Sequence, residues 1–277
     1  MDIVRSVAEM REIVAGWRKT GESVSLVPTM GALHDGHLSL VHSVSDKADR
    51  TITSIFVNPT QFSPSEDFAT YPRDEARDLS MLEAAGVDLV FTPEMTQMYR
   101  EGHRTKVEVQ ELSQFLEGES RPHFFIGVAT IVAKLLIQSM PDIAIFGEKD
   151  YQQLCVIRSM ARDLDLPVEI LGGATVRESD GLAMSSRNSY LTSVERTLAP
   201  RLHQEITGVA TRVTKGDPIE IACKDAVNEL DEAGYNSVDY IAVRDAETLE
   251  PVMEGRPMRV LAAAWLGKTR LIDNVAV

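Results

Sequence analysis

Residues 23–45 read SVSLVPTMGALHDGHLSLVHSVS, and this stretch decides how the first half of the chain folds. The apolar run Val24–Val27 predicts a buried strand, and Pro28 is expected to end it because proline lacks a backbone donor. From Leu38 onward the apolar positions recur every three residues, which is the spacing of one helix face. The stretch therefore predicts a strand, a small-residue turn and a helix in direct succession.

The turn carries two histidines, His34 and His37, where the strand gives way to the helix. In open α/β sheets the ligand crevice lies at such places, and the backbone N–H groups that open a helix attract phosphate. A plain turn with two solvent-exposed histidines is the simpler interpretation. A metal site is a weaker one, because no third His, Cys or carboxylate lies nearby at ligand spacing.

Strands and helices alternate along the chain as far as residue 175. After an amphipathic helix at the N-terminus, apolar β-rich runs recur between helical patterns of about 12 residues; they lie at 24–27, 51–57, 88–91, 143–146 and 168–171. Residues 105–109 are a further candidate, as an edge strand. This alternation is typical of βαβ units, so we expect an α/β fold with a doubly wound, parallel, Rossmann-like sheet.

The pattern changes near residue 176. Helical patterns extend to about residue 214 and over 219–233, and short strands follow at 238–243, 259–265 and 269–272. We therefore expect two domains. Residues 1–175 form the Rossmann-like domain, and residues 176–277 form a smaller α+β domain.

The composition limits the classes of function. Lys and Arg total 28 and Asp and Glu total 42, so the formal net charge is −14, and no basic block is long enough to bind nucleic acid. No run approaches the roughly 20 apolar residues of a membrane span. The two cysteines, Cys155 and Cys223, are too few for a disulfide framework. The N-terminus lacks the apolar core of a signal peptide, so we expect a cytoplasmic protein.

Two further motifs have the residue types that bind phosphate. Gly147-Glu148-Lys149-Asp150 follows a buried strand and opens a helix, with Asp150 as a candidate N-cap. Residues 180–188 read DGLAMSSRN, whose hydroxyls, backbone N–H groups and guanidinium suit a triphosphate. Each motif also has a simpler interpretation, a solvated lysine in the first case and a capping loop in the second.

Taken together, four motifs carry a family resemblance. VPTMGALHDGHLSL, IFVNPTQF, FGEKDYQQL and VRESDGLAMSSRN occur in this order over about 160 residues. The first resembles the HxGH signature of the class I nucleotidyltransferases, and the set is similar to that of the pantothenate synthetase family.

The resemblance implies a reaction. (R)-Pantoate and β-alanine condense to pantothenate, ATP is cleaved to AMP and diphosphate, and a pantoyl adenylate is the intermediate. It also implies Mg²⁺ on the ATP phosphates, with Asp150 as an indirect partner, and a homodimer built through the N-terminal domain. Both reactants of the first step are anionic, so the site must neutralise charge.

The resemblance also implies roles for individual residues. His37 acts as proton donor, and His34 and Lys149 are the other two catalytic residues. Gln61 and Gln153 bind pantoate, and Gln61 also lies near β-alanine. The ATP-binding residues are Met30, Gly31, Ala32, Leu33, His34, Asp35, Gly36, His37, Gly147, Glu148, Lys149, Asp150, Val176, Met184, Ser185, Ser186 and Arg187. Asn58 and Tyr71 are further candidates, near the phosphates and on a lid formed by residues 63–73.

One stretch departs from the family pattern. The family reads RPxHFxGV near the pantoate pocket, whereas residues 121–128 read RPHFFIGV. Phe124 stands at the histidine position and His123 one residue earlier, so no contact of this loop is carried over to the chain.

Three alternatives remain open at this point. Another HxGH adenylyltransferase acting on a small carboxylate or phosphate substrate has the same first motif, but the FVNPTQF and GEKDYQQ strings disfavour a phosphopantetheine adenylyltransferase. The acidic balance and the lack of a basic appendage disfavour a tRNA synthetase. A catalytically silent nucleotide-binding protein is disfavoured because the matched nucleotide residues are all present.

Overall fold

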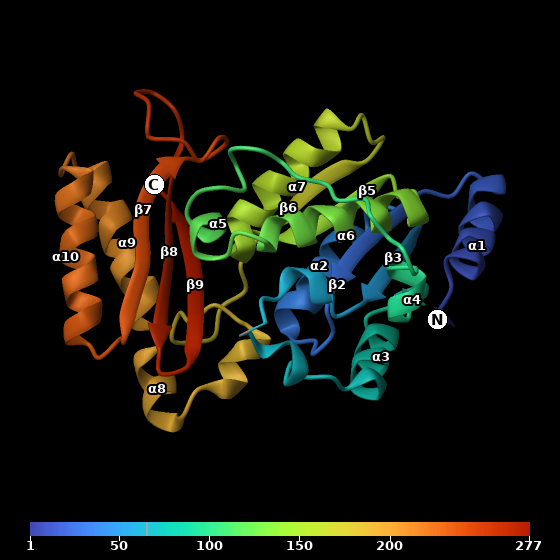
Figure 1. Ribbon diagram of the computed structural model, residues 1–277, viewed down its shortest axis with the longest axis horizontal. Coiled ribbons are helices and arrows are strands. Elements are labelled where there is room, and N and C mark those ends of the chain that lie inside the picture. The colour runs from blue at the N-terminus through green and yellow to red at the C-terminus, as the bar shows by residue number, and fades with distance from the viewer. Residues whose placement is uncertain (65) are drawn as a thin grey trace. The chain divides into compact units, whose positions relative to one another are not determined.

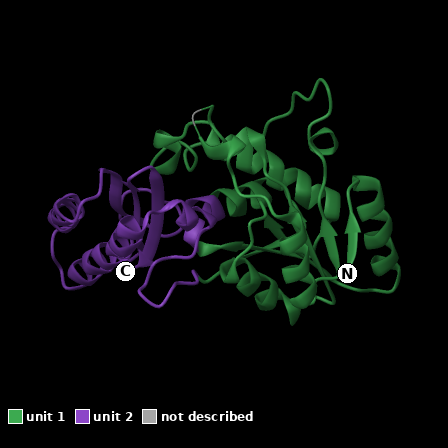
Figure 2. Cartoon of the chain, turned by 90° about the horizontal axis from the view of Figure 1, so that it is seen from below, with its two compact units in different colours: residues 1–148, 156–174 green, residues 149–155, 175–277 purple. Residues whose placement is uncertain are grey.

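The computed structural model describes residues 1–64 and 66–277. These residues divide into two compact units (Figure 2). Unit 1 consists of residues 1–148 and 156–174, and unit 2 of residues 149–155 and 175–277. Within the described residues, every helix is too short or too polar to cross a lipid bilayer.

Unit 1 is built on a parallel sheet of six strands in the order β1-β4-β3-β2-β5-β6. The strands are β1 (Asp2–Val4), β2 (Val24–Thr29), β3 (Arg50–Ile55), β4 (Leu89–Phe91), β5 (Ile143–Gly147) and β6 (Glu169–Gly173) (Figure 1). This confirms the predicted parallel α/β sheet. Strand β1 was not expected, because three residues are too few to show a period.

The helices of unit 1 connect these strands; residues 149–150 of η3 and the start of α7 belong to unit 2, and α7 continues in unit 1. They are α1 (Val7–Lys19), α2 (Asp35–Ser45), η1 (Pro59–Gln61), η2 (Asp67–Ala69), α3 (Glu75–Ala84), α4 (Met95–Met98), α5 (Glu117–Ser120), α6 (Phe124–Ser139), η3 (Glu148–Asp150) and α7 (Tyr151–Asp163), where η marks 3₁₀ helices. Helices α2 and α3 share an apolar cluster with β2, β4 and β5, which includes Val27, Val41 and Ile145. Burial of this cluster fixes helix α2, and with it the histidine turn, against the end of β2.

Unit 2 combines an antiparallel sheet, β7 (Ser237–Asp245), β8 (Met258–Leu266) and β9 (Thr269–Ala276), with helices. These are η4 (Ser186–Tyr190), α8 (Ser193–Leu198), α9 (Arg201–Thr214) and α10 (Ile219–Glu232). Leu202 and Ile206 of α9 and Leu230 of α10 pack against Val260 and Ala262 of β8. This packing forms the core of the α+β arrangement that the sequence predicts.

Pro28 does not end strand β2, contrary to expectation. The strand continues to Thr29 and pairs with β3 along its whole length, whereas its ladder with β5 covers only Ser25 and Leu26. Beyond Leu26, β2 has no ladder with β5, so no backbone N–H is needed on that side of the strand. Proline, which lacks this N–H, is therefore tolerated at position 28.

Two other expectations were wrong. Residues 105–109 form no strand. The single helix expected up to residue 214 is divided into α8 and α9 at Pro200, which precedes α9 and has no N–H to continue the hydrogen-bond ladder of α8.

Candidate active site

The two histidines cap helix α2 reciprocally. His34 is the N-cap residue, and its Nδ1 accepts from the backbone N–H of Gly36 at 3.1 Å. The backbone N–H of His34 donates in turn to Nδ1 of His37 at 3.4 Å, and the two ring centroids lie 4.1 Å apart. The spacing of three residues is thus the spacing of a capping box, here built from imidazoles instead of hydroxyl and carboxyl groups.

This geometry sets the proton positions on the two rings. A backbone N–H can only donate, so Nδ1 of each half-buried imidazole is an acceptor and the neutral ring carries its proton on Nε2. Both rings therefore present an Nε2–H donor. An anion with accessible oxygen atoms, such as a phosphate, is the complementary ligand.

A buried carboxylate of helix α3 holds the turn that leads to the histidines. Asp78 is 1 % exposed, and its two oxygens accept from the backbone N–H groups of Ala32 and Leu33, each at 2.8 Å. Gly31 and Ala32 both have positive φ, 78° and 51°, and a Cβ on Gly31 would lie 2.9 Å from an Asp78 oxygen. Burial raises the pKa of the Asp78 carboxyl, although both hydrogen bonds act in the opposite direction.

The sequence did not predict the role of Asp78. Its 3.6-residue pattern places this residue on α3, but no local signal connects it with a turn 45 residues earlier. A buried acid in an otherwise apolar helix face is the only hint that the sequence offers.

Gln61, a predicted pantoate residue, lies half-buried at the end of η1. Its Nε2 lies 3.1 Å from the sulfur of Met30, the first residue of the predicted ATP loop. Asn58 and Tyr71 are both buried, at 1 % and 6 % exposure. The buried Asn58 side chain donates from Nδ2 to Oε1 of Gln61 at 3.1 Å. Of the predicted lid, residues 63–73, Ser65 lies outside the described residues.

The departure at residues 123 and 124 has a structural counterpart. His123 is exposed at the start of α6, whereas the Phe124 ring lies 3.8 Å below the guanidinium of Arg121. Arg121 also pairs with Glu66 at 2.7 Å and donates to the backbone oxygen of Gln61 at 3.1 Å. Phe124 thus supports an arginine that holds the backbone of Gln61, a contact that the sequence did not predict.

In unit 2, the sheet holds the backbone of Lys149. Asn274 of β9 is 4 % exposed; its Nδ2 donates to the Lys149 carbonyl oxygen at 2.9 Å, and its Oδ1 accepts from Nε of Arg259 at 2.6 Å. The Arg259 guanidinium lies 3.7 Å from the centre of the Tyr151 ring. Helix α7 begins at Tyr151, directly after the 3₁₀ turn Glu148–Asp150.

The last of the four motifs, VRESDGLAMSSRN, begins with a closed hairpin. Backbone bonds join Glu178 to Leu182 at 2.8 Å and Met184 to Val176 at 3.0 Å. Arg177, at the base of this hairpin, forms a two-pronged ion pair with the buried Asp273 of β9, at 2.6 and 2.9 Å. Asp273 and Asn274 are adjacent, so one stretch of β9 fixes both Lys149 and the hairpin.

The hydroxyl-rich turn begins where the hairpin ends. Ser185 caps η4 by accepting from the Arg187 backbone N–H at 3.3 Å, and Asn188 donates to the Ala183 carbonyl oxygen at 3.1 Å. Met184, Ser185, Ser186 and Arg187 are all half-buried. They are therefore accessible to a ligand and held by a defined backbone.

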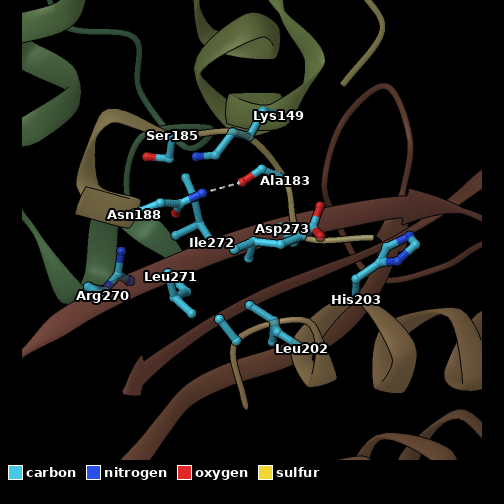
Figure 3. Close-up of a pocket in the computed structure, with 12 residues that line it drawn as sticks. Lys149, Ala183, Ser185, Asn188, Leu202, His203, Arg270, Leu271, Ile272 and Asp273 are labelled. Carbon is cyan, nitrogen blue, oxygen red and sulfur yellow. Dashed lines mark hydrogen bonds between the residues drawn. The ribbon is translucent and has the colours of Figure 1, made fainter. Parts of the chain in front are cut away.

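Lys149 and Ser185 line one cavity of unit 2, together with Asn188, Arg270 and Asp273 (Figure 3). In Figure 3 Lys149 and Ser185 lie at the top of the view, and His203 lies beside Asp273. Burial, and next the Arg177 charge, lower the pKa of His203, while Asp273 acts in the opposite direction. Unit 2 thus brings together a cation and a hydroxyl from two motifs that lie 36 residues apart in the sequence.

The remaining predicted residues have less specific surroundings. Gly147 and Glu148 are half-buried at the end of β5, and Gln153 is half-buried on α7. Among the described residues, no three His, Cys, Asp or Glu side chains come together in a way that would hold a metal ion. Neither Cys155 nor Cys223 forms a disulfide.

Comparison with known proteins gives concordant matches along the whole chain. Among curated proteins, the pantothenate synthetase of Paramagnetospirillum magneticum is 57% identical over 99% of this chain and 97% of its own length. The pantothenate synthetase of Caulobacter vibrioides is 55% identical over 99% of this chain and 98% of its own length.

Solved structures agree with this result. Pantothenate synthetase from Thermus thermophilus superposes with a TM-score of 0.93 at 43% identity, covering 99% of both chains. The ligase from Francisella tularensis, complexed with beta-gamma ATP and beta-alanine, gives a TM-score of 0.84 at 33% identity, covering 100% of this chain and 97% of that one. A family model described as Pantoate-beta-alanine ligase matches residues 2–276. The chain therefore belongs to the pantoate-beta-alanine ligase family.

Proposed function

We propose that the residues of the two units divide the work of one reaction, the ATP-dependent condensation of (R)-pantoate with β-alanine. Family membership assigns this reaction to the chain, and the family match over residues 2–276 is the observation that carries it. The pantoate carboxylate attacks the α-phosphorus of ATP and diphosphate leaves. The β-alanine amine then attacks the acyl carbon of the adenylate. AMP leaves and keeps the oxygen atom that came from the pantoate carboxylate.

The histidine turn binds ATP in this proposal. Residues Met30 to His37 form the loop that supplies two imidazoles, and His37 acts as the proton donor toward a phosphate oxygen. The support is the pair of Nδ1 acceptors, which leaves the proton of each neutral ring on Nε2. Charge that develops on the phosphate in the transition state is stabilised by such fixed donors.

The residues around Lys149 neutralise the negative charge of the triphosphate. The Lys149 ammonium is a compact point charge, and Ser185, Ser186 and Arg187 add hydroxyl and guanidinium donors. Gly147, Glu148, Asp150, Val176 and Met184 complete the nucleotide-binding set. Support comes from the cavity that Lys149 and Ser185 share and from the hairpin that fixes the serines.

Gln61 and Gln153 bind pantoate, and Gln61 also lies near β-alanine. Amide groups suit this task, because they hydrogen-bond hydroxyl and carboxylate oxygens without adding charge. The Francisella tularensis relative is complexed with beta-alanine, which supports β-alanine as a ligand of this chain.

Mg²⁺ is the proposed metal. It is held mainly by phosphate oxygens and water, as is usual for this ion, with Asp150 as an indirect partner. The half-buried carboxylate of Asp150 next to Lys149 fits that role, and the described residues form no all-protein cage that would compete with it. The ion supplies charge neutralisation on the triphosphate.

We propose three further properties. The protein is a cytoplasmic homodimer built through its N-terminal domain, and sedimentation of the purified chain tests the dimer. It binds no nucleic acid, in line with its net charge of −14. Residues 1–175 bind ATP and pantoate, while residues 176–277 carry the MSSR loop.

The reaction is tested by quantifying AMP in four mixtures of protein, ATP and Mg²⁺, with both, either or neither of pantoate and β-alanine. We expect AMP to accumulate over many turnovers only when both are present. Accumulation without pantoate or without β-alanine would contradict the assignment. His37→Ala should abolish the signal, whereas His42→Ala, an exposed histidine of the same helix, should retain it.

A further inference from the structure

The amide of Gln61 has a defined orientation. Its Oε1 accepts from Nδ2 of Asn58 at 3.1 Å, so its Nε2 faces the sulfur of Met30 at 3.1 Å. A thioether sulfur is a weak acceptor. The Gln61 amide group thus holds one firm bond on its oxygen side and one weak bond on its donor side.

Asn58 cannot reverse this arrangement, because each end of its own amide is fixed. Its Nδ2 also donates to the Gly127 carbonyl oxygen at 3.1 Å, and its Oδ1 accepts from the backbone N–H of Thr60 at 3.4 Å. A flipped Asn58 would face a carbonyl with an oxygen and an N–H with an NH₂ group. At 1 % exposure no bulk water compensates for those losses.

Tyr99 supplies the shortest of these contacts. Its hydroxyl donates to Oδ1 of Asn58 at 2.7 Å and lies 3.1 Å from the Thr60 hydroxyl. Burial raises the pKa of the Tyr99 phenol, so the group remains a protonated donor at neutral pH. The ring is 6.3 Å from Phe56 and 5.1 Å from His103, which fixes its direction.

The backbone of this region is also fixed by close packing. Gly127 of α6 lies so near η1 that a Cβ on it would stand 2.4 Å from the Thr60 carbonyl oxygen and 2.7 Å from the Gln61 nitrogen. The hydrogen bonds above therefore act on a rigid support, and they decide only which way the side-chain amides point.

We propose that Tyr99 is a positioning residue which, through Asn58, holds the Gln61 amide with its NH₂ group toward the substrate. Gln61 then recognises an oxygen acceptor of the substrate, a carboxylate or hydroxyl oxygen, which displaces the weak contact with Met30. This inference rests on the proposed role of Gln61 in binding pantoate, and it adds the direction of the hydrogen bond and the residue that sets it.

The test is the Michaelis constant for pantoate in Tyr99→Phe, measured at saturating ATP and β-alanine. Phenylalanine removes only the hydroxyl. We expect the KM for pantoate to rise about three- to tenfold, the size of one buried hydrogen bond. The KM for ATP should stay within about twofold, a split that general loss of stability does not produce. An unchanged KM for pantoate would overturn the proposal.

Tyr235→Phe is the matched control, because its hydroxyl also donates to a buried acceptor, the Ala199 carbonyl oxygen at 2.9 Å. It should lower the melting temperature without changing the KM for pantoate. A similar rise of the KM in both variants would mean that the effect of Tyr99→Phe is one of stability, and would contradict positioning.

Gln61→Ala separates the proposed role of Gln61 in binding pantoate from the positioning role of Tyr99. If it leaves the KM for pantoate unchanged, the proposed role of Gln61 is wrong and the inference falls with it. If it raises the KM while Tyr99→Phe does not, only the positioning role is wrong. In the double variant we expect no rise beyond that of Gln61→Ala alone. A full additional three- to tenfold rise would mean that Tyr99 acts on another group.

Discussion

The turn before His34 in unit 1 and the segment at Lys149 in unit 2 solve the same problem with different side chains. In the proposed function each presents a group for phosphate, and each is fixed by a buried polar residue far away in the sequence. Asp78 accepts from two backbone N–H groups of the first turn. Asn274 donates to one backbone carbonyl of the second segment. The first anchor is a carboxylate, and the second is a neutral amide.

The conformation of each segment explains this difference. Gly31 and Ala32 have positive φ, which is costly for alanine, whereas residues 148–150 form an ordinary 3₁₀ turn. The strained turn at Gly31 and Ala32 is held by a strong acceptor, the buried Asp78 carboxylate, which binds two backbone N–H groups at once. The unstrained segment at Lys149 is held by a single hydrogen bond from Asn274.

The largest effect is expected from Lys149→Ala, which removes the charge that the second segment presents. Loss of one preorganised electrostatic donor typically costs about 100- to 1,000-fold in rate. We expect a fall of that size in single-turnover adenylation, with an unchanged melting temperature. Arginine at position 149 should restore little, because a planar guanidinium cannot take the place of a compact ammonium.

Lys268→Ala is the control for this prediction, since Lys268 is an exposed lysine of the same unit. It should adenylate pantoate at the parental rate. If Lys149→Ala does so as well, Lys149 is only a solvated charge, and the two segments are not comparable in function.

A smaller effect is expected from Asp78→Asn. The new NH₂ group faces a backbone N–H of the first turn, a mismatch worth about 1–3 kcal/mol. A neutral amide is also easier to bury than the carboxylate, whose burial raises its pKa. The net loss of unfolding free energy should therefore lie near the lower end of that range of about 1–3 kcal/mol. The same mismatch disfavours the active conformation of the turn over others, and 1.36 kcal/mol corresponds to tenfold, so we expect adenylation to slow on the order of tenfold.

Asp74→Asn is the matched change on the same helix, where the exposed side chain caps α3 by accepting from the Arg77 N–H. It should leave the adenylation rate within about twofold. Equal losses in both variants would mean that α3 as a whole, and not the bond to the turn, controls activity.

Asn274→Asp should have a milder effect than Asp78→Asn. It keeps an acceptor for Arg259 but turns an oxygen toward the Lys149 carbonyl oxygen. The unstrained segment can move away from this repulsion, so only the bond itself, worth about 0.5–1.5 kcal/mol, is lost. We expect adenylation to slow about threefold to tenfold. Asn236→Asp is the control, because the Asn236 side-chain oxygen accepts from the Gly267 N–H at the turn that joins β8 and β9. A greater loss for Asn274→Asp than for Asp78→Asn would reverse the comparison.

The smallest effect concerns pH. The folded state lowers the pKa of His203, so between this pKa and the ordinary value near 6.5 the unfolded chain binds more protons than the folded one. The free energy of unfolding therefore falls as the pH drops below about 6.5. Melting curves from pH 5 to 8 should show a smaller decline for His203→Gln than for the parent. Identical slopes would contradict this.

The sequence predicts the parts of this structure that are encoded locally. The change of apolar spacing after Pro28 is enough to place the histidines at a strand-to-helix junction, and the alternation of patterns is enough for a parallel sheet. Residues 92–123 have no clear period, so the edge strand expected at residues 105–109 was wrong. The division at Pro200 was missed because its flanking segments share one helical pattern.

The anchors of the site are the part that the sequence could not predict. Asp78 and Asn274 act on backbone groups 45 and 125 residues away, and such contacts have no local signature. The two histidines illustrate the same limit, because a capping box is normally recognised from hydroxyl and carboxyl side chains. Motif residues can therefore be predicted from sequence, whereas the residues that orient them require the folded chain.

In the proposed function both segments serve a first step that does not involve β-alanine. A rapid-quench experiment with excess protein, ATP, Mg²⁺ and pantoate, but without β-alanine, isolates that step. We predict that diphosphate and protein-bound pantoyl adenylate form in equal amounts in one turnover, and that β-alanine then converts the adenylate to pantothenate and AMP. Release of diphosphate only after β-alanine is added would contradict the account.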